Sequence, residues 1–145
     1  MGNKVAFIVA SHGQMAKYAL DSAEMVVGKQ ENCGVLTVSM DMTLDDAVGQ
    51  MEQEFDRLDR SAGTVILVDI LGGTPSNVSG RLALTHDNIL VLSGLNLPML
   101  IDLLMNRERS LEEIADSLEE SYHSGFSNIT KLFKERNEED ECEIL

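Results

Sequence analysis

A regular alternation of short apolar runs with segments of helical pattern is the feature that most constrains the fold of this chain. The four runs consist mainly of aliphatic and small residues, and they are 4–11, 33–40, 64–70 and 88–94. A strand that faces water on one side alternates polar with apolar residues, whereas a strand buried on both faces is apolar throughout. The pattern therefore predicts an α/β protein with an open, doubly wound, mainly parallel sheet sandwiched between helices.

Segments between and after these runs have the spacing of amphipathic helices. They are 13–28, 43–59, a helix that follows the third run and ends near Thr85, a short helix that begins at Pro98, and 110–126. Two of them begin with a Ser or Thr that is followed three positions later by an acid, Thr43 with Asp46 and Ser110 with Glu113. This arrangement is typical of a capping box, which marks the first turn of a helix.

Size and charge narrow the class of protein. A chain of 145 residues suits one domain with one core, and a net charge of −14 disfavours binding to nucleic acid. No apolar run approaches the roughly 20 residues that a helix needs to cross a bilayer, so we expect no membrane insertion. Cys33 and Cys142 have the spacing of neither a disulfide framework nor a metal site. We therefore expect a cytoplasmic protein without a metal or another cofactor.

His12 follows the first apolar run, and Asp69 lies at the end of the third. Doubly wound folds place the first strand in the middle of the sheet, so we expect these two strands to be neighbours. Their carboxyl ends, where such folds bind ligands, would then bring His12 and Asp69 together. An aspartate beside a histidine accepts the proton of one ring nitrogen and directs the other nitrogen outward. Taken alone, His12 is better explained by a cap or a core position; beside Asp69, a reactive role is favoured.

The segment GGTPSN (72–77) follows at the same edge. Gly72 and Gly73 allow the backbone to approach a ligand, and the N–H groups at the following helix start, with the Thr74 hydroxyl, can hold an anion. The alternative is an ordinary turn in which Thr74 caps the helix. The segment lacks the lysine of a phosphate-binding loop and is not GxGxxG, so it gives no support to a nucleotide site. A histidine, an aspartate and an anion cradle together suggest phosphate carried on the histidine.

Four segments, in their order and spacing, resemble the enzyme IIA domain of the mannose family of the sugar phosphotransferase system. They are SHG (11–13), SAEMVVG (22–28), LVDILGGTPSN (67–77) and SGLNLPMLIDLL (93–104), and the resemblance covers about residues 4–133. It implies a phosphotransferase in which His12 accepts a phosphoryl group from the phosphocarrier HPr and donates it to a IIB domain. Asp69 is then the hydrogen-bonded partner of His12, and Gly72, Gly73 and Thr74 form the phosphate-binding turn.

The same resemblance implies a fifth, antiparallel edge strand that is exchanged in a homodimer. The segment GFSNITKLF (125–133) is the candidate for it, although its pattern does not distinguish a strand from a helix. The IIA domain is expected over 1–133, and 134–145 is expected to be an acidic, solvated tail. A separate IIB protein is the expected acceptor and would in turn serve membrane IIC and IID subunits. Leu71 stands where many relatives have an aromatic residue, so stacking at the docking surface is not expected here.

Other functions remain open at this point. One is a regulatory binding module with phosphorylation as its switch, although the set of His12, Asp69 and Thr74 argues for turnover. Another is the IIA-like phosphotransfer subunit of a dihydroxyacetone kinase, which GGTPSN and NLPML make the weaker match. The third is a metal-dependent hydrolase, for which the expected edge lacks a second histidine or a carboxylate cluster. His86 and His123 are expected to have structural roles.

Overall fold

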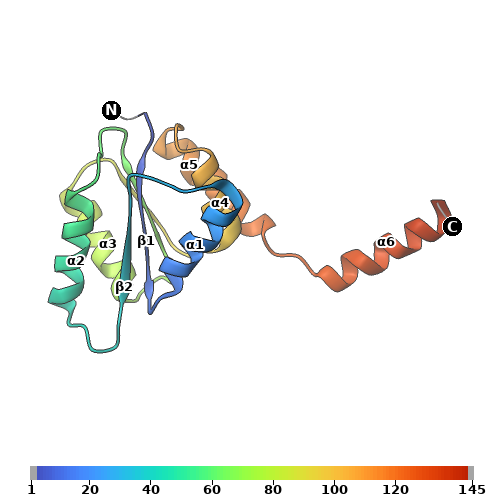
Figure 1. Cartoon of the computed structure of the whole chain (residues 1–145), viewed down its shortest axis with the longest axis horizontal. Helices are drawn as coiled ribbons and strands as arrows, with labels where there is room; N and C mark the ends of the chain where they lie inside the picture. The colour runs from blue at the N-terminus through green and yellow to red at the C-terminus, as the bar shows by residue number, and fades with distance from the viewer. Residues whose placement is uncertain (1–2, 144–145) are drawn as a thin grey trace.

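The structure is a computed structural model that describes residues 3–143. Strands and helices alternate along the chain in the predicted order, with helices alone after the fourth strand (Figure 1). The elements are β1 (Ala6–His12), α1 (Met15–Val27), β2 (Cys33–Val38), α2 (Leu44–Asp56), β3 (Thr64–Val68), α3 (Thr74–Thr85), β4 (Ile89–Leu92), α4 (Leu97–Met105), α5 (Leu111–Ser124) and α6 (Ile129–Glu143). In the described part of the chain, no helix is both long and apolar enough to cross a membrane.

The sheet has four strands in the order β2-β1-β3-β4, and every pair is parallel. β1 therefore lies between β2 and β3, with Val9 aligned to Val35 on one side and to Leu67 on the other. This confirms both the predicted fold class and the expectation that the first and third strands are neighbours.

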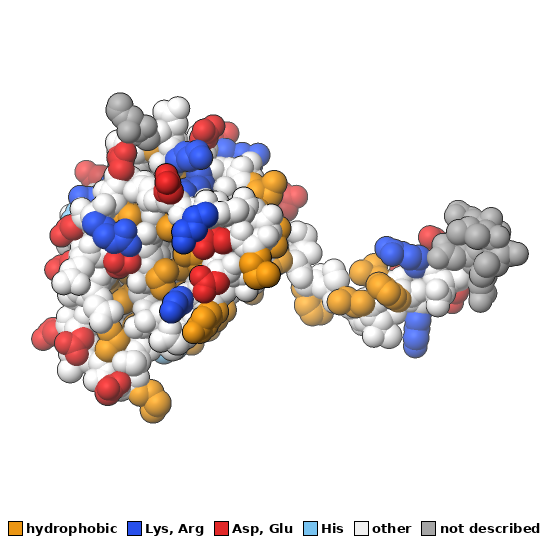
Figure 2. Space-filling view, in the orientation of Figure 1, with side chains coloured by type: hydrophobic (Ala, Val, Ile, Leu, Met, Phe, Trp, Pro, Cys, Tyr) orange, Lys and Arg blue, Asp and Glu red, His pale blue; other side chains and the backbone are white. Residues whose placement is uncertain are grey.

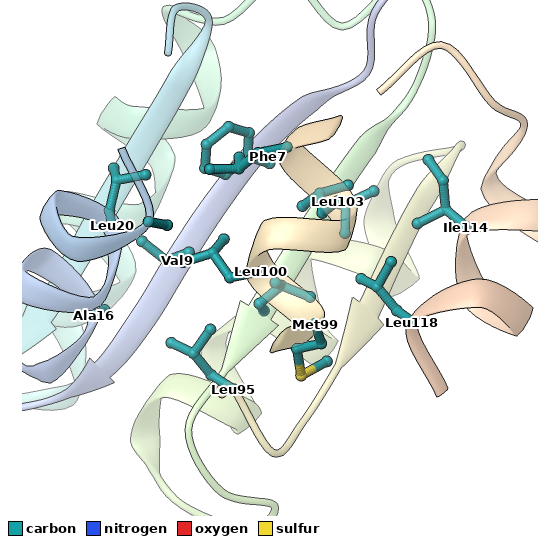
Figure 3. Packing of buried hydrophobic residues seen from close by; sticks show 14 of the residues in the cluster. Phe7, Val9, Ala16, Leu20, Leu95, Met99, Leu100, Leu103, Ile114 and Leu118 are labelled. Carbon is teal, nitrogen blue, oxygen red and sulfur yellow. The ribbon is translucent and has the colours of Figure 1, made fainter. Parts of the chain in front are cut away.

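Two cores lie on the two faces of the sheet, because successive side chains of a strand point to opposite faces. Phe7 and Val9 belong to the core beneath α1, α4 and α5, whereas Ile8 and Ala10 belong to the core beneath α2 and α3. All four side chains are fully buried. Figure 3 shows the first of these cores, where α4 contributes Met99, Leu100 and Leu103. Burial on both faces explains why the strand is apolar throughout.

Both predicted capping boxes are present. Thr43 Oγ1 accepts from the Asp46 N–H at 3.1 Å and Asp46 Oδ2 accepts from the Thr43 N–H at 3.0 Å. Ser110 and Glu113 make the same reciprocal pair. α4 begins one residue earlier than predicted, at Leu97, because the Asn96 side chain caps it by accepting from the N–H of Met99.

Arg107 holds the amino-terminal end of the sheet. This residue is 5% exposed, and its guanidinium donates to the carbonyl oxygens of Val5, Glu31 and Asn32 over 2.7–3.1 Å. A further N–H group donates to Gln30 Oε1 at 3.2 Å. Since these residues precede β1 and β2, Arg107 ties the starts of both strands to the loop that follows α4.

The structure differs from the prediction over residues 125–133, which were expected to supply an antiparallel strand. A connection covers 125–128, and α6 then runs from Ile129 to Glu143, so the sheet formed by the described residues is parallel throughout. Ile129, Leu132 and Phe133 recur at helical spacing, and Lys131 lies one turn before Glu135, with 4.0 Å between their charged groups. The predicted acidic tail is thus helical through Glu143, and its last two positions, 144–145, lie outside the described residues.

Candidate active site

His12 is the last residue of β1, and Asp69 directly follows β3. Because the two strands are adjacent and parallel, their carboxyl ends meet at one edge of the sheet. His12 Nδ1 lies 2.8 Å from Asp69 Oδ2, and the same oxygen accepts from the backbone N–H of His12 at 2.9 Å. The expected meeting of the two side chains is confirmed.

The surroundings of Asp69 keep its carboxyl group ionised. Its side chain is 10% exposed, and this burial alone would raise its pKa. Hydrogen bonds from the backbone and ring of His12 and from the backbone N–H of Ile70 outweigh that effect, so the pKa of Asp69 is below its usual value. An ionised carboxylate can only accept, so Nδ1 of His12 carries the donated proton and a neutral ring has its lone pair at Nε2. The His12 side chain is 48% exposed.

Gly73 lies directly against the imidazole ring. A Cβ atom built on Gly73 would contact Cε1 of His12 and lie 2.7 Å from Nε2. Gly73 is also the N-cap residue of α3, a helix of 12 residues, and no side chain caps that end. The free N–H groups and the positive end of the helix dipole favour an anion at such a terminus. Nε2 therefore faces a helix end that suits a phosphoryl group.

The start of α3 also fixes the positions of Gly72 and Thr74, the other two residues of the predicted turn. Thr74 is the first residue of α3, so the alternative in which Thr74 is the N-cap does not hold. Gly72 has φ +94°, a left-handed conformation that glycine adopts without strain. The structure brings Gly73 to His12 directly, whereas Gly72 shapes the loop between Asp69 and the helix.

Ser11 also shapes the site, although it was not among the predicted site residues. Its side chain is buried, and Oγ accepts from the N–H of Ala16 at 2.7 Å and donates to the carbonyl oxygen of Gly13 at 3.2 Å. Gly13 has φ +61°. Ser11 thus holds the turn that contains His12 against the first turn of α1. A small hydroxyl residue shortly before a helical pattern is the signal that could have indicated this.

A cavity of about 500 Å³ lies beside Asp69. Its other walls are Gly94, Leu95, Asn96, Tyr122, His123, Gly125 and Phe126. His123, expected to be structural, therefore lines a cavity that adjoins the site, and its ring packs edge-on to Tyr122. His86 packs edge-on to Phe55 with ring centroids 4.8 Å apart, as a structural histidine does. The described residues contain no group of three or more His, Cys, Asp and Glu that could hold a metal ion.

Comparison with known proteins identifies the family. The family model EIIA-man, described as the PTS system fructose IIA component, matches residues 6–121. The chain belongs to this family. His12, Asp69 and the turn of Gly72, Gly73 and Thr74 all fall within the matched part of this EIIA-man chain.

Individual relatives agree with that assignment. The mannose-specific EIIAB component of the PTS system of Escherichia coli K12 is 32% identical over 104 residues, which are 72% of this chain and 32% of that protein. The chain thus spans about a third of the length of this relative. The sorbose-specific EIIA component of Klebsiella pneumoniae is 35% identical over 100 residues, 69% of this chain and 73% of that protein. The crystal structure of the phosphotransferase system component EIIA from Streptococcus agalactiae superposes with a TM-score of 0.79 at 29% identity, covering 88% of this chain and 98% of that one.

The contact between Gly73 and His12 leads to a first prediction. Gly73→Ala should displace the imidazole from Asp69, because the added methyl group would overlap the ring. In mildly alkaline solution, ¹⁵N-resolved NMR spectra should show His12 protonated at Nδ1 in the wild type and a mixture of tautomers in the variant.

Gly80→Ala is the matched control, since Gly80 lies in the same helix and a Cβ there would meet nothing within 4 Å. It should keep the His12 tautomer and raise the free energy of unfolding by about 0.5–1 kcal/mol. An unchanged His12 tautomer in Gly73→Ala would show that the contact does not position the ring.

Proposed function

We propose that this EIIA-man chain is a cytoplasmic phosphocarrier of a sugar phosphotransferase system. In this proposal His12 accepts a phosphoryl group from phospho-HPr and donates it to a IIB acceptor, which serves the IIC and IID membrane subunits. The observation that carries the proposal is the hydrogen bond of Nδ1 to Asp69, which leaves Nε2 facing both solvent and the start of α3. Membership of the family supports the same function.

The proposed transfer is a displacement at phosphorus. The lone pair of His12 Nε2 attacks the phosphoryl group, the bond from phosphorus to the donor nitrogen breaks, and that electron pair returns to the donor ring. Nδ1 keeps its proton throughout, so the phosphorylated imidazole of His12 gains positive charge. Asp69, ionised and 2.8 Å away, stabilises that charge. Donation to the IIB acceptor is the same step with His12 as the leaving group.

The phosphoryl oxygens would lie at the start of α3 in this mechanism. The backbone N–H groups of Gly73 and Thr74 and the Thr74 hydroxyl are the nearest donors in sequence, and the helix dipole adds a favourable potential. Gly72 allows the loop to turn into this position.

The surface at this edge of the sheet suits a protein as the phosphoryl donor. Large apolar side chains are exposed at the starts of α1 and α2 and in the loops after β2 and β3. They are Met15, Met40, Leu44, Ile70 and Leu71. A group of exposed apolar residues is typical of a protein interface. Direct transfer of the phosphoryl group between two histidines requires that the two rings come within bonding distance. The partner must therefore contact the surface around His12. Leu71, 82% exposed, would make an apolar contact there without aromatic stacking.

We further propose that the chain forms a homodimer in which α6 contacts the second copy. Figure 1 shows α6 extending away from the body of the protein, and Figure 2 shows hydrophobic side chains along its first half. Phe126, Ile129, Leu132 and Phe133 are all exposed, Phe126 by 85%. A helix of this length is marginal in water without a packing partner, so a second copy that buries this stripe would stabilise it.

Phosphorylation by phosphoenolpyruvate, enzyme I and HPr tests the assignment of His12. We expect one acid-labile phosphate per chain in the wild type and none in His12→Ala, because the attacking nitrogen is removed. His123→Ala is the control and should accept phosphate like the wild type. Labelling that survives in His12→Ala would disprove the assignment.

Asp69→Asn tests the role of the carboxylate. The amide has nearly the same shape but no charge, and it can present an N–H group to Nδ1, which favours the wrong tautomer. Phosphoryl transfer from phospho-HPr should slow by about 100-fold or more in rapid-quench measurements, with an unchanged circular dichroism spectrum. Transfer at the wild-type rate would remove Asp69 from the mechanism.

The dimer is tested by analytical ultracentrifugation of the full chain. Replacing Leu132 and Phe133 together by Ser should lower the mass from that of two chains to that of one, because the apolar stripe of α6 is removed. Asn137→Ser, an exposed position on the same helix, should leave the mass unchanged. A wild-type protein that sediments as a single chain would contradict the proposal.

A further inference from the structure

β2 is one of the two outer strands of the sheet, and side chains from α2 and from its C-cap residue bind two of its outward backbone groups. The hydrogen bonds at its ends show which residues face outward. Asn32 accepts from the N–H of Phe7, and Val38 accepts from the N–H of Gly13, so even-numbered residues here point toward β1 and its loop. In a strand the backbone groups of alternate residues point to opposite sides, so those of Cys33 and Val35 face away from the sheet.

Glu54 and Arg57 bind two of these outward groups. Glu54 Oε1 accepts from the backbone N–H of Val35 at 2.9 Å. Arg57 Nη2 donates to the backbone carbonyl oxygen of Cys33, also at 2.9 Å. One donor and one acceptor of successive outward residues are thus bound, as they would be by a neighbouring strand.

The two side chains also hold each other. Arg57 Nη2 donates to Glu54 Oε1 at 2.9 Å, and Arg57 Nε donates to Glu54 Oε2 at 3.1 Å, which is a bidentate pair one turn apart on the helix. Partial burial would raise the pKa of Glu54, but the hydrogen bonds from Arg57 and Val35 outweigh it and hold the pKa below its usual value. Both groups are therefore charged at neutral pH.

Gly34 makes the space for this arrangement. It lies between the two bonded residues of β2, and a Cβ atom at Gly34 would be 2.9 Å from Glu54 Oε1 and 3.2 Å from Glu54 Cβ. A side chain at this position would push the Glu54 carboxylate away from the strand. Gly34, the Glu54 carboxylate and the Arg57 guanidinium thus together cover this part of the β2 edge.

The opposite edge is different. Among the described residues, no hydrogen bond from outside the sheet reaches the backbone of Ile89–Leu92, which is β4, and the four residues are only half-buried. An outer strand with free N–H and C=O groups can pair with a strand of another chain.

We propose that Glu54 and Arg57 close the β2 edge against pairing with another chain, and so confine association through strands to the β4 edge. The pair takes the place of one residue of a further strand by binding the Val35 N–H and the Cys33 carbonyl group, through which that strand would attach. This inference concerns the edge of the sheet only and does not depend on phosphoryl transfer by His12.

Glu54→Ala in the full chain tests whether this pair closes the β2 edge. The Val35 amide loses its acceptor, so its hydrogen–deuterium exchange, followed by NMR, should accelerate about tenfold. With the edge uncovered, the mass measured by light scattering should rise with protein concentration above the wild-type mass. Glu54→Gln, which keeps an oxygen for Val35, should stay at the wild-type mass and thereby separate loss of the hydrogen bond from loss of charge.

Two controls exclude other causes of association. Glu52→Ala makes the same change of charge on α2, and Thr43→Ala weakens α2 by removing its N-cap while leaving the edge covered. Both should keep the wild-type mass. If Glu54→Ala does not fold, Arg57→Ala uncovers the Cys33 carbonyl group and should show the same rise in mass. A folded Glu54→Ala or Arg57→Ala protein that keeps the wild-type mass at every concentration would overturn the proposal.

Discussion

The parallel pairing of β1 with β3 is the constraint on which the rest of this structure depends. Ala10 is aligned with Val68, and the pairing ends as both strands reach the same edge of the sheet. That alignment places Asp69 within hydrogen-bond distance of both the backbone and the ring of His12. A largely buried carboxylate without such partners would be costly, and a half-exposed imidazole without the carboxylate would lose the hydrogen bond that directs Nε2 outward. One strand pairing therefore stabilises the aspartate and orients the histidine.

The two ends of the sheet are built differently. At the amino-terminal end, a buried arginine binds three backbone carbonyl groups and joins the starts of β1 and β2 to the loop after α4. At the carboxyl end, glycines, an uncapped helix start and exposed apolar side chains surround the histidine. Hydrogen bonds are satisfied within the chain at the first end, whereas donors and apolar surface remain available to a partner at the second. This asymmetry fits the proposed exchange of phosphate with other proteins at one edge of the sheet.

Much of the fold could be predicted because it depends on local pattern. Apolar runs, helical spacing and the capping boxes at Thr43 and Ser110 are properties of neighbouring residues. The secondary structure of segment 125–133 was harder to predict, because a short mixture of polar and apolar residues fits either a strand or a helix. The three- and four-residue spacing of Ile129, Leu132 and Phe133 is that of a helix, and the structure has a helix from Ile129 onward. Within the site, the strand order alone was enough to bring His12 to Asp69.

The sequence by itself determined that this chain forms a parallel sheet between two layers of helices, with a histidine and an aspartate at its carboxyl edge. The physical reason is that burial on both faces requires strands that are apolar throughout, and these leave polar residues only where they end. Only the tertiary structure decided that Gly73 lies against the imidazole, that Ser11 holds the turn and that Glu54 reaches across to Val35. Contacts of this kind depend on how a helix start or a helix face packs against a strand, and no spacing along the chain encodes that geometry.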